Sequence, residues 1–218
     1  MNRILSTIVI SLCLALSACE DTKNYNTAVY LLLDTSGTYT KELRKAQLII
    51  KYMLSMLKAG DSFAVARIDS GSFSEKDIIA KATFDARPST SNRQKRDFAA
   101  AVDKFIRGVK SSRYTDISGG LLQGREYLNE TKAGSKYILI YSDLKEELPA
   151  GYKRDFDIPL DGYTVLALNV TKLRSDNIDP VEYLTRVESW EQKVTEGGGK
   201  WYIVNDIEKD GALDLANY

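Results

Sequence analysis

Two kinds of hydrophobic pattern alternate along the chain. Short runs are apolar at almost every position, as in strands covered on both faces of a sheet. Longer runs repeat apolar residues every three or four positions, as on one side of an amphipathic helix. We expect strands over 28–33, 62–68, 78–84, 137–141, 163–169 and 201–204, helices over 43–57, 89–109, 117–128 and 181–194, and a short helix in the tail. Gly60 is expected to cap the first helix, and the glycines at 197–199 to stop the last long one.

The order of these elements indicates the fold class. Strands that alternate with helices form a mostly parallel sheet with helices on both faces. The link over 69–77 is too short for a helical crossover, so the second and third strands are expected to be antiparallel neighbours. We therefore predict an α/β, Rossmann-like doubly wound fold. Its six-stranded sheet is mostly parallel, with one antiparallel edge strand.

The first 19 residues, MNRILSTIVISLCLALSAC, read as a processing signal. Arg3 precedes an uncharged stretch over 4–18, which is too short for a comfortable transmembrane span. The stretch ends in Leu-Ser-Ala-Cys, which resembles the bacterial lipobox, in which the cysteine becomes the acylated first residue. We expect a signal peptide over 1–18, a lipidated Cys19 with a short tether over 19–26, and one domain over 27–218. An ordinary cleaved signal or an uncleaved anchor helix is the alternative.

Composition excludes several kinds of chemistry. The 218 residues contain no histidine, which excludes a Ser-His-Asp triad, a Cys-His pair and a His-ligated metal. Cys13 would leave with the signal, so no disulfide is expected in the domain. A bound metal would have to use oxygen ligands, which suits Mg²⁺, Mn²⁺ or Ca²⁺. The balance of 30 basic against 30 acidic residues argues against a nucleic-acid binder.

Acids and hydroxyls gather where predicted strands end. Asp34 follows the first strand in VYLLLDTSGTYT, and Asp143 follows the strand in KYILIYSD. Sites in open parallel sheets form beyond the carboxyl ends of the strands, so both acids should face one crevice. The loop before the third helix can reach that crevice with Thr115. Two carboxylates and three hydroxyls suit an octahedral Mg²⁺; the candidate ligands are Asp34, Ser36, Thr38, Thr115 and Asp143.

Three segments together resemble the von Willebrand factor type A domain. The metal-ion-dependent adhesion site of that family reads Asp-x-Ser-x-Ser, then a Thr, then an Asp, in three loops. DTSGT resembles the first element, with Thr38 in place of the final serine; YTDISGGL resembles the threonine loop, and ILIYSDLKEE the last acid. ESWEQKVTEGGGKWYIVND also resembles the final helix, glycine turn and strand. The resemblance extends from about residue 27 to the C-terminus.

The resemblance implies a role for each residue. Ser36 and Thr38 would bind the metal directly, and Thr115 directly or through water. Asp34 and Asp143 would act mainly through bound water. An ion with few direct carboxylates stays electrophilic and can accept an Asp or Glu carboxylate from a partner protein. In this family that is binding chemistry rather than catalysis, so we do not expect an enzyme.

Other interpretations of the same residues stay open. Asp34, Ser36 or Thr38 could cap the first helix, Thr115 or Asp116 could cap the third, and Asp143 could be a turn residue. LLLDTSGT also resembles the first motif of haloacid-dehalogenase phosphatases, in which Asp34 would be the nucleophile. That family has an acid where Ser36 stands, and the phosphatase interpretation leaves Thr115 unexplained. A third interpretation is a degenerate structural domain of the type A fold without metal.

These observations predict a membrane-anchored, extracytoplasmic lipoprotein. It would bind a partner protein through its divalent cation and contact the membrane through its lipid anchor. Glu20 follows Cys19. By resemblance to lipoprotein sorting in enteric-type bacteria, this favours the periplasmic face of the outer membrane.

Overall fold

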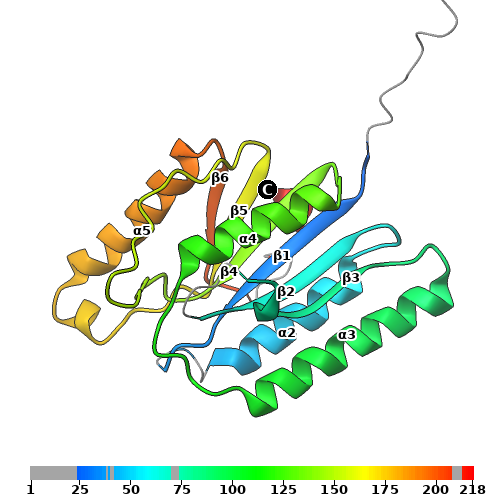
Figure 1. The fold of residues 1–218 in the computed structure, drawn as a ribbon, viewed down its shortest axis with the longest axis horizontal. Coiled ribbons are helices and arrows are strands. Elements are labelled where there is room, and N and C mark those ends of the chain that lie inside the picture. The colour runs from blue at the N-terminus through cyan, green and yellow to red at the C-terminus, as the bar shows by residue number, and fades with distance from the viewer. Residues whose placement is uncertain (1–23, 38, 40–41, 70–73, 208–212) are drawn as a thin grey trace, which may run out of the picture.

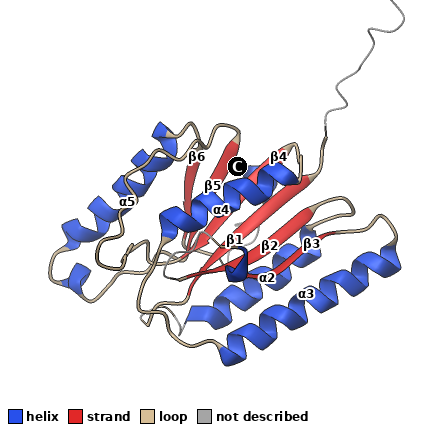
Figure 2. Cartoon of the chain, viewed as in Figure 1, coloured by secondary structure: helices blue, strands red, loops and turns tan. Residues whose placement is uncertain are grey.

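The computed structural model describes residues 24–37, 39, 42–69, 74–207 and 213–218. In these ranges one sheet of six strands lies between layers of helices (Figures 1 and 2). Its strands are β1 (Thr27–Asp34), β2 (Ser62–Ile68), β3 (Ile78–Thr83), β4 (Ser135–Tyr141), β5 (Tyr163–Leu168) and β6 (Lys200–Val204). The helices are α2 (Leu43–Met56), α3 (Pro88–Gly108), α4 (Ile117–Glu130) and α5 (Pro180–Glu196), with short 3-10 helices η2 (Glu75–Asp77), η3 (Ser175–Asn177) and η4 (Leu215–Asn217).

The strand order across the sheet is β3-β2-β1-β4-β5-β6. β1 pairs in parallel with both β2 and β4, and β5 and β6 continue the parallel arrangement. β3 pairs antiparallel with β2 and forms one edge. The predicted fold class, with its antiparallel edge strand, is therefore confirmed. The order changes direction between β1 and β4, and crevices for ligands form at such switch points.

The core has two halves, one on each face of the sheet. Successive β1 side chains point to opposite faces, so Tyr30 and Leu32 belong to one half, and Leu31 and Leu33 to the other. Helices α4 and α5 cover the first face, and α2 and α3 cover the second. Every core residue in the described ranges lies between Ala28 and Leu213. The chain from Glu20 onward therefore carries the whole described core.

Glycines allow α4 to pack closely on β1. A Cβ at Gly120 would lie 2.7 Å from a Leu32 methyl, and a Cβ at Gly124 would lie 2.7 Å from the Tyr30 ring. Carbon atoms in contact prefer about 3.5–4.0 Å, so neither position has room for a larger residue. This close packing fixes the first turn of α4 near the end of β1.

The end of the first helix differs from the prediction in how it is capped. Helix α2 ends at Met56, and Leu57 is already extended, so Gly60 is not its cap. Gly60 has a φ of 86° and donates its N–H to the Phe84 carbonyl at 2.7 Å. It therefore turns the chain into β2. The short helix expected in the tail is the single 3-10 turn η4. Among the described helices, none is both long enough and apolar enough to cross a membrane.

Candidate metal site

The first and last predicted acids lie at the same edge of the sheet. Asp34 is the last residue of β1, and Asp143 lies two residues beyond the end of β4. The two strands are in register up to the pair of Leu33 and Tyr141. The residue after Tyr141, Ser142, donates its hydroxyl to Asp34 Oδ2 at 2.6 Å. Parallel pairing therefore brings together two segments that are more than 100 residues apart in sequence.

Asp34 is completely buried and accepts hydrogen bonds from neutral groups. Its Oδ1 accepts the Ser36 backbone N–H at 2.8 Å, and its Oδ2 accepts the Ser142 hydroxyl. Burial raises the pKa of the Asp34 carboxyl, and these hydrogen bonds only partly oppose that shift. The charge of Glu147 raises it further. A buried carboxylate in such surroundings is stabilised by a nearby cation.

Thr115 is held against the loop that follows β4. Its side chain is buried, and its backbone exchanges two hydrogen bonds with Glu147, at 2.7 and 2.9 Å. The same segment also pairs with the loop after β1, because the Ser112 N–H donates to the Thr35 carbonyl at 2.8 Å. These contacts join all three predicted loops through their backbones.

Asp143 occupies a tight turn. It is 2% exposed, and its Oδ1 accepts the Lys145 N–H at 2.9 Å. Leu144 adopts a left-handed conformation with a φ of 65°, and its N–H donates to the Ser142 hydroxyl. The carbonyl of Asp143 accepts the Arg186 Nε–H at 2.8 Å. Asp143 therefore makes the side-chain-to-backbone hydrogen bond typical of a turn residue, and the hydroxyl of the neighbouring Ser142 ties this segment to the end of β1.

The helix-cap alternative does not account for Asp34 or Ser36. Helix α2 begins at Leu43 with Glu42 in the cap position, well beyond both residues. Ser36 is half-buried beside Asp34, and Thr38 lies outside the described residues. The cap of α4 is Asp116, which accepts the Gly119 N–H at 2.8 Å.

Two arginines hold the site loops, and neither was predicted from the sequence. Arg154 forms a forked pair with Asp116, next to Thr115, with contacts of 3.0 and 2.6 Å. Arg186 pairs with Asp176 at 2.7 Å and also binds the Asp143 carbonyl. Arg154 is 38 positions from Asp116, and Arg186 lies in a different element from Asp176. No local sequence pattern therefore identifies these pairs.

Tyr39 anchors the loop after β1 to the end of β5. Its hydroxyl donates to the Asn169 carbonyl at 2.5 Å and accepts the Asn169 side-chain amide at 2.9 Å. Burial raises the pKa of the Tyr39 phenol, helped by Tyr141 and by the charges of Asp34 and Asp143. Tyr39 thus ties the loop after β1 to the end of β5 beside both acids.

The donor set decides which cation fits. Within the described ranges, no group of three or more Asp, Glu, Cys or His side chains is placed to hold a metal. A metal at this edge would therefore depend on hydroxyls as well as acids. Asp34, Ser36, Thr115 and Asp143 offer only oxygens, from three joined loops. That set fits a hard divalent cation.

No protein-family model matches the sequence, and no curated protein matches it. Solved structures resemble the chain at low identity. An aerotolerance-related membrane protein from Bacteroides fragilis is 13% identical over 88% of this chain and 98% of its own, with a TM-score of 0.52. A von Willebrand factor type A protein from Catenulispora acidiphila is 14% identical over 84% of this chain and 39% of its own, with a TM-score of 0.48. Manganese-loaded TRAP protein from Plasmodium vivax is 15% identical over 67% and 58%, with a TM-score of 0.43.

The chain has a doubly wound α/β fold, and a von Willebrand factor type A protein is among the solved structures that resemble it. The likeness to the Bacteroides fragilis protein is one of fold, because the two chains are only 13% identical. The chain spans 39% of the Catenulispora chain and 58% of the TRAP chain, so it corresponds to a portion of each. In this doubly wound fold, the candidate site lies at the switch point between β1 and β4.

Proposed function

We propose that this chain is a metal-dependent protein-binding module. In this proposal a divalent cation is held by the five residues predicted from the sequence: Asp34, Ser36, Thr38, Thr115 and Asp143. The observation that carries the proposal is the joining of three loops around the buried Asp34, through Ser142 and through the backbone pair of Thr115 and Glu147.

The bound ion, Mg²⁺ or else Mn²⁺ or Ca²⁺, would supply an electrophilic coordination position. Hydroxyls would provide neutral ligands, and the two acids would balance its charge. An Asp or Glu of a partner protein would complete the shell. The manganese in the TRAP structure is consistent with divalent metals in this fold. The role of this chain's residues is to orient the ion toward solvent.

Binding is favoured over catalysis by the residue at position 36. A phosphatase of the alternative type needs a carboxylic acid there to protonate its leaving group, and Ser36 is a hydroxyl. Ser36 is also tied by its backbone to Asp34 and to the segment around Ser112. We therefore propose that the chain is not an enzyme.

The proposed location is the cell envelope, with a lipid on Cys19. β1 runs away from the N-terminal end of the domain and ends at the candidate site (Figure 1). A strand of eight residues spans about 26 Å. A tether at residue 19 would thus hold the domain by one end and present the metal at the other. The Bacteroides fragilis relative is described as a membrane protein, which agrees with this location. We place the chain at the periplasmic face of the outer membrane.

The experiment uses the chain from Glu20 onward as bait for envelope extract. Retention of a defined protein is expected in Mg²⁺, and its loss in chelator or in Asp34→Asn. Asp97→Asn, an exposed change on α3, is the matched control and should retain it. Hydrolysis of p-nitrophenyl phosphate that is lost in Asp34→Asn would favour the phosphatase. Retention that is unchanged by chelator and by Asp34→Asn would favour an interaction domain that needs no metal.

A further inference from the structure

We propose that a basic cleft beside the candidate metal site binds an extended acidic segment of the partner protein. This inference rests on the proposed function and names the chemistry of its ligand. The basic cleft has a volume of about 960 Å³. The C-terminal part of α3, the loop that follows it, the ends of β2 and β3, and η2 form its walls.

The floor of the basic cleft is apolar. Side chains of β3 and α3 contribute to it, and these are only partly buried by the rest of the described chain. Apolar surface that stays accessible in a concave site favours a ligand with apolar side chains. The apolar residues that line the cleft on the α3 side are Ile79, Ala101, Phe105 and Val109.

The rim of the basic cleft carries an excess of positive charge. Its two acids, Asp69 and Asp77, both pair with Arg67, at 3.5 and 2.9 Å. The other four cations are exposed, and the ion pairs found among the described residues involve none of them. A surface of one sign attracts ligands of the other and speeds their association. These four cations are Lys76, Lys104, Lys110 and Arg113.

The basic cleft adjoins the loops of the candidate metal site. Ser112 lines the cleft and forms a backbone bridge with Ser36. Tyr114 also lines it, and the next residue is Thr115. A partner segment that places one carboxylate on the metal could therefore continue directly into the cleft.

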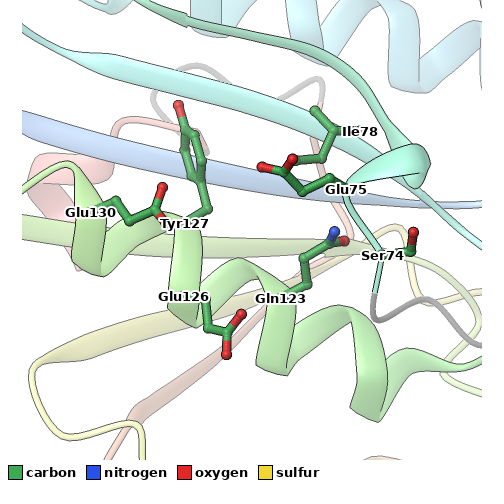
Figure 3. Close-up of a pocket in the computed structure, with 7 residues that line it drawn as sticks. All are labelled: Ser74, Glu75, Ile78, Gln123, Glu126, Tyr127 and Glu130. Carbon is green, nitrogen blue, oxygen red and sulfur yellow. The ribbon is translucent and has the colours of Figure 1, made fainter.

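A second hollow on the other side of β3 has the opposite charge (Figure 3). Its volume is about 220 Å³, and Glu75, Glu126 and Glu130 line it together with Tyr127. These three glutamates would repel an acidic segment. The charge pattern around β3 thus favours the α3 side as the path of the ligand.

An extended protein segment suits both parts of the basic cleft. In an extended chain, alternate side chains point in opposite directions, so acids can face the rim while apolar residues face the floor. A polyanion without apolar groups, such as a sulfated polysaccharide, would leave the floor unused. We therefore assign the cleft to a protein segment in which Asp or Glu is interspersed with apolar residues.

The test is selection of a random dodecapeptide library, displayed on phage, against the chain from Glu20 onward in Mg²⁺. Enriched peptides are expected to combine Asp or Glu with apolar residues. By fluorescence polarisation, their affinity should fall about tenfold or more in Lys104→Glu/Lys110→Glu. Lys51→Glu/Lys200→Glu changes the net charge equally at exposed positions outside the cleft and should bind like the wild type. Thermal unfolding of both double variants verifies that they are folded.

The outcomes separate this proposal from the proposed function. Binding that is lost in chelator but unchanged in Lys104→Glu/Lys110→Glu would overturn the cleft and leave the metal module standing. Binding that survives chelator but is lost in that variant would support the cleft and refute the metal module. Enrichment without acidic residues, or binding of heparin without any acidic peptide, would overturn the cleft proposal.

Discussion

Two buried aspartates near the carboxyl edge of the sheet are stabilised in opposite ways. Asp176 pairs with Arg186 at 2.7 Å, and this hydrogen-bonded pair lowers its pKa. Asp34 accepts hydrogen bonds from a hydroxyl and an amide, and burial raises its pKa. Asp116, next to Thr115, is paired like Asp176, with Arg154 at 2.6 Å.

The comparison teaches that burial alone does not distinguish a structural acid from a site acid. Asp116 and Asp176 receive their counter-charge from the chain itself. Asp34 lies at the switch point of the sheet, where a cation from solution would supply that charge. Variants that remove the arginine partner of Asp176 should therefore lower the stability of the fold. Variants of Asp34 should instead weaken metal binding.

The largest expected effect concerns the structural pair. Arg186→Met leaves Asp176 buried with an unbalanced charge, which typically costs about 3 kcal/mol or more. The free energy of unfolding, measured with urea, should fall by roughly that amount. Arg174→Met, at an exposed arginine beside η3, is the control and should change little. If Arg186→Met lowers the free energy of unfolding no more than Arg174→Met does, Asp176 does not depend on Arg186 for its counter-charge.

The next effect is stabilisation by metal. At a metal concentration of 100 times the dissociation constant, the free energy of unfolding should rise by about 2.7 kcal/mol. Asp34→Asn should show no such rise in thermal unfolding, because it removes the charge that the cation balances. Asp176→Asn should lower the free energy of unfolding without metal, but metal should still raise it by the same amount. Equal metal responses in Asp34→Asn and the wild type would contradict the assignment of Asp34.

A smaller effect is expected from the hydroxyl that orients Asp34. Ser142→Ala removes the 2.6 Å hydrogen bond to Oδ2. Groups that orient a metal ligand typically change affinity by about 10- to 100-fold, and we expect the lower end. Metal titration of Ser142→Ala beside Ser189→Ala, an exposed serine of α5, measures this. Unchanged affinity would mean that Ser142 only closes the turn.

The smallest effect is a pH dependence from Asp176. Because its pKa is lower in the folded chain than in the unfolded one, it stabilises the fold above the unfolded pKa of about 3.9. That contribution is lost as the pH falls through the folded pKa. From pH 5 downward, the wild type should therefore lose more stability than Asp176→Asn/Arg186→Met. Parallel acid-unfolding curves would show that the pair does not titrate as described.

The fold was predictable because the strands are buried on both faces. A run such as residues 28–33 is apolar throughout, which marks it as a strand. The alternation of such runs with amphipathic runs then indicates a mostly parallel sheet. The meeting of Asp34 and Asp143 at one edge was predictable for a related reason, because each of them follows such a run. Parallel pairing then places the ends of these runs at one edge.

The supporting contacts were not predictable from local patterns. Arg154 and Arg186 reach Asp116 and the Asp143 loop across 38 and 43 positions of sequence. Both lie in segments whose composition is that of ordinary solvated surface. The sequence pattern does not distinguish Gly60 from a helix cap, because a glycine after an amphipathic run also occurs in a turn that leads into a strand. The arginine pairs and the role of Gly60 both depend on tertiary contacts that form only in the folded chain.

The most direct test of the account is calorimetric titration of Mg²⁺ and Mn²⁺ into the chain from Glu20 onward. Asp34→Asn and Thr115→Val are titrated beside it, with Asp97→Asn and Thr195→Val as matched exposed controls. The account predicts saturable binding at one site that is lost in the first two variants and kept in the controls. Absence of binding to the wild type, or binding that survives both Asp34→Asn and Thr115→Val, would contradict it.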